Sequence, residues 1–146
     1  MSPRPLDPVL QSLVLGLHHV AIVVPSIAEA RKLYVDLLGL RPKEVEHVAD
    51  QKVNVLVCYA GLQRIELVEP AAPDSPVSAF LAKRGGGLHH LAYRVGSIER
   101  ALAALKSAGL RLIDERPRPG AHGTRIAFVH PSATGGVLSE LVEDPT

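Results

Sequence analysis

The chain contains one fourteen-residue phrase twice, as LHHVAIVVPSIAEA from Leu17 and as LHHLAYRVGSIERA from Leu88. The two copies are identical at eight of the fourteen positions. A second shared string, ELVE, begins at Glu66 and again at Glu140. The phrases start 71 residues apart and the strings 74 residues apart, so the spacing of these landmarks differs by only three residues. We therefore interpret the chain as a duplicated module.

Each copy of the phrase predicts a strand followed by a helix. The runs HHVAIVV and HHLAYRV are rich in branched apolar residues and are closed by Pro25 and Gly96, which is typical of strands. Helices are expected over 26–39 and 97–109, each opened by a capping serine and closed by a glycine. Three more strands follow in each half: RPKEVEHV, KVNVLVCYA and RIELVEP, then RLIDERP, TRIAFVHP and VLSELVE. Both halves therefore read β-α-β-β-β.

The length of 146 residues suits one compact domain or two closely packed halves. We place the domain at 15–146, with modules at about 15–70 and 86–146. The linker at 71–85 contains a short predicted helix, PVSAFLAKR, and ends in a run of glycines. Residues 1–14 contain three prolines, and we expect them to form a flexible leader.

Composition excludes several classes of function. The formal net charge of +1 offers no general attraction to nucleic acid or to a membrane surface. No apolar run is long enough to span a bilayer, and the first residues lack the pattern of a signal peptide. The single cysteine, Cys58, lies in an apolar run, which favours a buried structural thiol over a nucleophile. We expect a cytoplasmic protein.

The histidine pairs and the repeated glutamates suggest a metal site. Neighbouring residues of a strand face opposite sides, so only one histidine of each pair can face a shared pocket. If each half curls, its concave face presents one histidine and one glutamate. Two imidazoles and two carboxylates suit zinc, cobalt, nickel, manganese or iron. The alternative is that these are polar residues at strand starts and rim charges, but their recurrence at matching positions of both halves favours metal binding.

These features resemble the vicinal oxygen chelate superfamily, which includes glyoxalases, bleomycin resistance proteins and dioxygenases, and within it the methylmalonyl-CoA epimerase family. The resemblance runs from about Leu17 to Glu143 and includes GAHGTRIAFVHP and TGGVLSELVE. The HP followed by TGGVLxEL is its most discriminating part. It implies an α+β fold in which two tandem βαβββ modules form a curved, cup-like mixed sheet with the helices outside.

The resemblance also implies a ligand set for one divalent metal ion. Carried over position by position, the ligands are His19, Glu66, His90 and Glu140. Cobalt is the favoured ion, with manganese, nickel and zinc as alternatives. The other histidines fall outside the pattern, with partial exposure or hydrogen bonding expected for His18 and His89 and a place in a loop that could close over substrate for His122.

The implied reaction interconverts the R and S forms of methylmalonyl-CoA. A weakly acidic proton must leave carbon 2, and a metal that chelates the thioester oxygen and the free carboxylate would stabilise the enolate. Epimerisation also needs an acid and a base on opposite faces of that carbon. The resemblance gives these roles to Glu140 and to a glutamate in a pattern like PEQxV, where this chain has ADQKV and therefore Asp50. The shorter Asp50 leaves Glu44 and Glu46 as alternatives.

Other functions use the same fold. A glyoxalase I-type lactoylglutathione lyase has a similar metal shell, although the HPSATGGVLSELVE ending favours the epimerase. A ferrous extradiol dioxygenase needs only two histidines and one carboxylate. A binding protein without chemistry has no need of four ligands. The expected partners are an acyl-CoA substrate and a second copy in a homodimer, and basic residues available to the CoA phosphates are Lys52, Lys83, Arg84, Arg116 and Arg118.

Overall fold

The computed structural model describes residues 12–146. Of the predicted leader, only residues 12–14 fall among them, and Val14 already begins the first strand. The first module contains β1 (Val14–Val23), α2 (Ile27–Arg31), η1 (Lys32–Leu37), β2 (Arg41–Pro42), β3 (Glu46–Val48), η2 (Ala49–Gln51), β4 (Val53–Ala60) and β5 (Gln63–Pro70). After α3 (Pro76–Arg84), the second contains β6 (Gly87–Val95), α4 (Ile98–Ser107), β7 (Arg118–Pro119), η3 (Ala121–Gly123), β8 (Arg125–Val129), η4 (Pro131–Ala133) and β9 (Ser139–Glu143).

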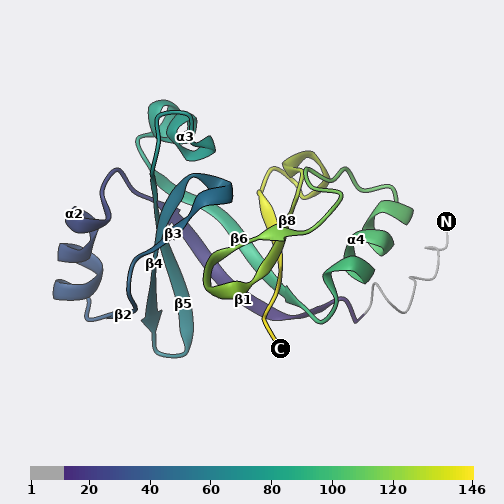
Figure 1. The fold of residues 1–146 in the computed structure, drawn as a ribbon, viewed down its shortest axis with the longest axis horizontal. Helices are drawn as coiled ribbons and strands as arrows, with labels where there is room; N and C mark the ends of the chain where they lie inside the picture. Colours follow the sequence, from purple (N-terminus) through teal and green to yellow (C-terminus); the bar gives the residue numbers. More distant parts are fainter. Residues whose placement is uncertain (1–11) are drawn as a thin grey trace.

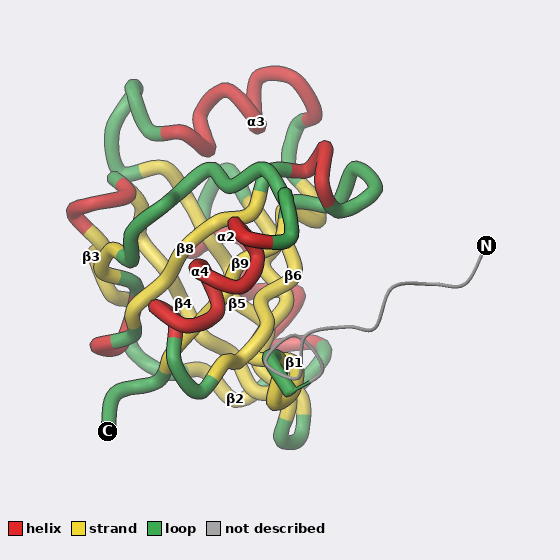
Figure 2. The backbone as a smooth tube through the Cα atoms, turned by 90° about the vertical axis from the view of Figure 1, so that its right-hand side faces the viewer, coloured by secondary structure: helices red, strands yellow, loops and turns green. Residues whose placement is uncertain are grey.

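All the strands belong to one mixed sheet in the order β2-β4-β5-β1-β6-β9-β8-β7, with β3 paired to β4. The modules meet where β1 pairs antiparallel with β6, which we call the central seam. On either side of it, β5 lies parallel to β1 and β9 lies parallel to β6. The predicted α+β fold with helices outside a curved sheet is confirmed, since α2 and α4 lie at opposite ends of the molecule (Figure 1). From the α4 end, that helix lies in front of the strands (Figure 2).

The serines that the sequence predicts as N-caps do cap the first turns of α2 and α4. The side chain of Ser26 accepts a hydrogen bond from the backbone of Glu29, and that of Ser97 accepts one from Arg100. The first helix changes after one turn into a π-helical segment, in which the amide of Leu38 donates to the carbonyl of Leu33. None of the helices in the part of the chain described is long and apolar enough to cross a membrane.

Two strand predictions need correction. The segment RPKEVEHV forms two short strands, β2 and β3, instead of one. The segment RLIDERP (111–117) is not a strand, and its pairing is limited to an isolated bridge between Leu112 and Val129. The amides of Ile113 and Asp114 both donate to the carbonyl of Phe128, so the ladder does not advance along the partner strand. The prolines that follow cannot donate, which keeps β7 to two residues.

The residues of β4 alternate between two apolar clusters. Val53, Val55 and Val57 face the concave side of the sheet, where they pack with Val68 and Val77. Leu56 and Cys58 face the other side and pack beneath α2 with Ile27 and Leu67. Cys58 is fully buried there, and burial raises the pKa of its thiol. The interpretation of Cys58 as a structural thiol therefore fits its environment.

Candidate active site

The four predicted ligands lie in two cross-strand rows at the central seam. Each row has a fully buried alanine in the middle, Ala21 in one and Ala92 in the other. The sheet register gives the rows as His90–Ala21–Glu66 and His19–Ala92–Glu140. Each alanine is thus flanked by one histidine and one glutamate. Because a methyl group takes little space, the longer side chains on both sides can meet above it.

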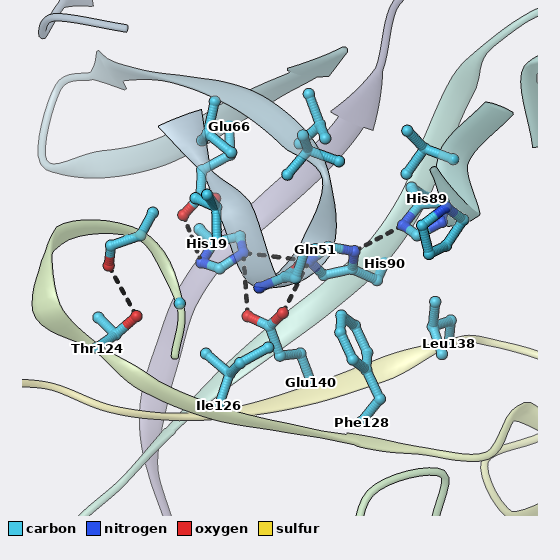
Figure 3. A pocket seen from close by; sticks show the side chains of 18 of the residues that line it. His19, Gln51, Glu66, His89, His90, Thr124, Ile126, Phe128, Leu138 and Glu140 are labelled. Atoms are coloured by element: carbon cyan, nitrogen blue, oxygen red, sulfur yellow. Dashed lines mark hydrogen bonds and ion pairs between the residues drawn. The ribbon is translucent and has the colours of Figure 1, made fainter. Parts of the chain in front are cut away.

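Three of the ligands converge with the geometry that a metal needs. The Nε2 atoms of His19 and His90 are 3.2 Å apart. Glu140 places Oε1 3.5 Å from His19 Nε2 and Oε2 3.6 Å from His90 Nε2 (Figure 3). Donors on a tetrahedral cation with bonds near 2.1 Å lie about 3.4 Å from one another. The side chains present therefore fit a divalent transition metal.

Glu66 approaches the same site from the other nitrogen of His19. Its Oε2 atom lies 2.9 Å from His19 Nδ1, and His18 Nδ1 lies 2.7 Å from that same nitrogen. His18, His19 and Glu66 thus form a second group with donor atoms close together. The contact with Glu66 uses one of its two carboxylate oxygens and orients the ring of His19, as a carboxylate behind a metal-binding histidine does.

Burial and mutual charge set the protonation of this cluster. Burial raises the pKa of Glu140 to about 8, aided by the charge of Glu66 and opposed by that of His19. Burial holds the pKa of His90 well below its usual value, and the charge of His19 adds to this. Burial alone would lower the pKa of His19, but Glu66 and Glu140 together raise it. The same pairing lowers the pKa of Glu66 despite its burial.

His18 lines the same pocket as His19, and His89 lines it with His90, so the prediction that only one histidine of each pair faces a shared pocket is wrong. His18 is 6% exposed, and of the two alternatives expected for it, partial exposure or hydrogen bonding, the structure shows hydrogen bonding. Its Nε2 atom lies 2.9 Å from Asp144 Oδ1 and 2.6 Å from Arg64 Nη1. A register shift between Leu17 and His19 interrupts the β1–β6 ladder, which allows both neighbouring histidines to be buried.

The other histidines lie outside the triad of His19, His90 and Glu140. His89 packs edge-on against Phe80, with ring centroids 4.9 Å apart, and also contacts the ring of His90. His47 is exposed and bonds to Asn54. His130 bonds to Ser132 at the start of η4.

The candidate second base, Asp50, is on η2 at the edge of the cup. Its side chain is 41% exposed and its Oδ2 atom lies 3.4 Å from Nη1 of Arg118. The neighbouring Gln51 lines the pocket, whereas Asp50 is not among the lining residues. Of the alternatives, Glu46 accepts a bond from the amide of His122 at 2.7 Å and contacts its ring at 3.2 Å, and Glu44 is exposed.

One pocket of about 300 Å³, which we call the main pocket, is lined by the four histidines of the two pairs and by Glu66 and Glu140. The His/Glu cluster forms a polar part of its wall, and most other lining residues are apolar: Val48, Val53, Val55, Val68, Pro76, Val77, Ile113, Ala121, Ile126, Phe128 and Leu138. Arg118 also lines it, a placement that the sequence did not reveal because the flanking loop is irregular. A polar cluster within an apolar pocket is typical of a small-molecule site.

Gly120 allows the loop beside the pocket to lie close to β8. A Cβ atom at this position would be 2.5 Å from Thr124 Oγ1 and 2.7 Å from Ile126 Cγ2. A larger residue here would therefore require the side chains of Thr124 and Ile126 to shift. Thr124 also donates to the carbonyl of Ala121 at 2.7 Å, which closes the turn against the main pocket.

Comparison with known proteins identifies similar sequences and folds. The family model of the Glyoxalase/Bleomycin resistance protein/Dioxygenase superfamily matches residues 18–128. The Bacillus subtilis protein YqjC is 47% identical over 127 residues, which is 87% of this chain and 91% of that protein. The human mitochondrial methylmalonyl-CoA epimerase is 39% identical over 143 residues, 96% of this chain and 81% of that enzyme.

A solved structure supports the same relationship. The crystal structure of methylmalonyl-CoA epimerase from Mycobacterium tuberculosis superimposes with a TM-score of 0.88 at 36% sequence identity. The superposition covers 98% of this chain and 95% of that one. The similarity therefore extends over both modules and the central seam.

Proposed function

This chain belongs to the glyoxalase/bleomycin resistance protein/dioxygenase superfamily, and we propose that it is an isomerase that interconverts the R and S forms of methylmalonyl-CoA. The observation that carries the proposal is the triad of His19, His90 and Glu140 in the wall of the main pocket. It combines ligands for a cation with a carboxyl group able to move a proton. Relatives that carry the epimerase name cover nearly the entire chain.

The proposed metal ligands are His19, His90, Glu140 and Glu66, the last through its second oxygen. The donor set of two imidazoles and two carboxylates fits a divalent ion, with cobalt favoured over manganese, nickel and zinc. When bound, such an ion supplies Lewis acidity to a developing enolate oxygen. The contact between Glu66 and His19 Nδ1, at 2.9 Å, would keep the ring directed toward the ion.

The proposed proton carriers are Glu140 and Asp50. Glu140 is 4% exposed and lines the main pocket, where its carboxyl group can reach a bound substrate to take and return a proton. Asp50 would act from the opposite rim, where Arg118 contacts it at 3.4 Å. Two carboxyl groups on different modules can approach carbon 2 from opposite faces.

We further propose an acyl-CoA substrate, a homodimeric assembly and a cytoplasmic location for this protein. The substrate would be an acyl-CoA thioester, with its acyl group in the main pocket. A homodimer is supported by exposed apolar side chains on β1, Val14, Leu15 and Leu17, which lie outside the main pocket. Mass measured by light scattering tests this. A cytoplasmic location is supported by the buried free thiol of Cys58.

The decisive experiment is proton exchange at carbon 2. The cobalt-loaded protein should incorporate deuterium from heavy water into (R)- and (S)-methylmalonyl-CoA and bring both to the same mixture. A loaded protein that exchanges nothing but isomerises the hemithioacetal of glutathione and methylglyoxal would be a glyoxalase. Inactivity toward both, with the metal bound, would favour a binding protein and reject the epimerase.

A further inference from the structure

Arg118 holds an unusual place in the main pocket. Among the lining residues of this pocket in the described part of the chain, it is the only lysine or arginine. Two of the other lining residues, Glu66 and Glu140, are carboxylic acids. A fixed positive charge is therefore present on one wall of an otherwise mostly apolar and partly acidic pocket.

Local structure fixes the position of Arg118. It lies on β7, where it pairs with Ile126 of β8. Its guanidinium lies over the ring of Phe128, 5.7 Å from the ring centroid. The proline on each side restricts the backbone, and the close packing of Gly120 against β8 continues this restraint. The side chain is thus preorganised instead of free to turn toward solvent.

The guanidinium N–H groups of Arg118 make only long contacts with other residues that the structure describes. Its contacts with Asp50 and Asp114 are both 3.4 Å long. Hydrogen bonds between charged groups are normally about 2.7–2.9 Å long. The Nε atom is buried and, among the described residues, has no hydrogen-bond partner of good geometry. A buried donor without a partner is costly, so an acceptor from a ligand would be favourable.

Arg118 is also linked to the His/Glu cluster. The ring of Phe128, beneath the guanidinium, packs edge-on against His90 with centroids 5.2 Å apart. The charge of Arg118 acts on Glu140, whose pKa it lowers against the larger effect of burial. Phe128 therefore contacts both the guanidinium and the ring of His90, and all three residues line the main pocket.

We infer that Arg118 binds the free carboxylate of the substrate and makes the main pocket selective for CoA thioesters that carry a carboxylate on carbon 2. This inference rests on the proposed function, because it names the feature by which that site recognises its substrate. A guanidinium matches a carboxylate with two parallel donors, which a lysine cannot do. A carboxylate has two oxygens, so the contact is compatible with a metal on one of them.

The contact between Arg118 and the substrate carboxylate would also position Asp50, the proposed second proton carrier. The substrate carboxylate is bonded directly to carbon 2, the atom that loses and regains the proton. A guanidinium shared between that carboxylate and Asp50 would hold the Asp50 side chain beside this carbon. Arg118 would then set both which thioester binds and where Asp50 stands.

The test compares two ligands that differ only in the carboxylate. Calorimetric titration of the cobalt-loaded protein with methylmalonyl-CoA and with propionyl-CoA gives their affinities. We expect Arg118→Met to weaken methylmalonyl-CoA binding on the order of 10- to 100-fold and to leave propionyl-CoA binding unchanged. Arg118→Lys should lose less, and only for methylmalonyl-CoA. Arg100→Met, at an exposed position on α4 outside the main pocket, serves as the control and should change neither.

Two outcomes would overturn the inference. An equal loss for both ligands would mean that Arg118 supports the CoA portion or the fold, and unchanged binding of both would mean that it touches neither. Thermal unfolding of each variant separates a loss of structure from the loss of the contact with the substrate. If Arg118→Met does not fold, the affinities of Arg118→Lys for the two ligands provide the test. Failure of the proposed function is distinct, because it would appear as absent deuterium exchange in the unaltered protein.

Discussion

The Nε2 atoms of His19 and His90 lie 3.2 Å apart although the two residues are separated by 71 positions. They are the equivalent histidines of the two repeats, and the antiparallel pairing of β1 with β6 brings them together. The glutamates follow from the outer parallel strands of each module. A duplicated sequence thereby produces one shared cluster, in which neither module alone holds all the proposed ligands.

Removal of a ligand should abolish tight metal binding without unfolding the protein. His90→Ala should bind Co²⁺ more than roughly 100-fold more weakly, since even the residues behind metal ligands contribute about 10- to 100-fold. Competition with a chromophoric chelator measures the affinity. His47→Ala is the control, because His47 is exposed and bonds to Asn54. Equal affinities of the two variants would remove His90 from the ligand set.

Metal binding should release protons near pH 7. The pKa of Glu140 is about 8 in the protein without a metal, so the group is largely protonated near neutrality and must lose this proton to coordinate. The raised pKa of His19 acts in the same direction. The metal affinity should therefore increase with pH. The number of protons released on binding should decrease as the pH rises toward about 9. Calorimetry in buffers of different ionisation enthalpy counts the protons, and a count independent of pH would contradict the prediction.

Asp50→Asn should lower proton exchange at carbon 2 and leave the metal content unchanged. Loss of a general base or acid costs on the order of 100-fold or more in rate. Asp50 itself makes no contact with the triad, whereas Arg118 holds it at 3.4 Å. Glu46→Gln is the matched variant, since Glu46 bonds to His122 nearby. If Glu46→Gln loses exchange while Asp50→Asn retains it, the second proton carrier is Glu46.

A larger residue in place of Ala92 should disturb both the sheet and the site. Ala92 is fully buried between His19 and Glu140, so leucine would overpack the row at a cost of about 1–3 kcal/mol in unfolding free energy. Denaturant unfolding and metal titration should both show a loss. Ala103→Leu, on the exposed face of α4, is the control and should leave both values unchanged. Normal metal affinity in Ala92→Leu would show that the row tolerates a larger neighbour.

The ion pairs of Asp144 should stabilise the fold in a pH-dependent manner. Burial raises the pKa of Asp144, but hydrogen bonds from Arg94 at 2.7 Å and from His18 at 2.9 Å bring it below its usual value. Because the pKa of Asp144 is lower in the folded protein than its usual value of 3.8, the ionised carboxylate stabilises the fold fully above pH 3.8. This stabilisation is lost as the pH falls through the lowered pKa.

Asp144→Asn should therefore cost about 1 kcal/mol near neutral pH, since the carboxylate is partly exposed. The difference from the unaltered protein should shrink at an acidic pH below the usual value of 3.8. Urea unfolding at both pH values measures it, with the exposed Asp36→Asn as the control. A difference that persists in acid would indicate that Asp144 acts through packing and not through charge.

The repeat and the serine caps were sufficient to predict the modules, because both are local or periodic signals. Alternation along a strand predicted that only one histidine of each pair faces a shared pocket, but His18, His19, His89 and His90 all line it. The register shift beside Leu17 depends on how β1 meets β6, which no local pattern encodes. In the same way, RLIDERP has strand-like composition, yet its pairing is limited by the carbonyl of Phe128 and by nearby prolines.

The location of Arg118 illustrates a different limit. As a sequence feature it was one of several scattered basic residues. Its place in the main pocket depends on the short pairing of β7 with β8, on the ring of Phe128 and on the absence of a side chain at Gly120. Such contacts join residues that are distant in sequence, and they become visible only when the irregular loop has a conformation.

The central seam also gives the molecule a built-in reporter of assembly. The proposed donors come from strands on both sides of it, so the visible absorption of a bound Co²⁺ ion would depend on the union of both halves. The colour would fade when β1 separates from β6, even where α2 and α4 keep their helical signal. Absorbance and circular dichroism, followed together during unfolding, would then distinguish the parting of the halves from the melting of each one.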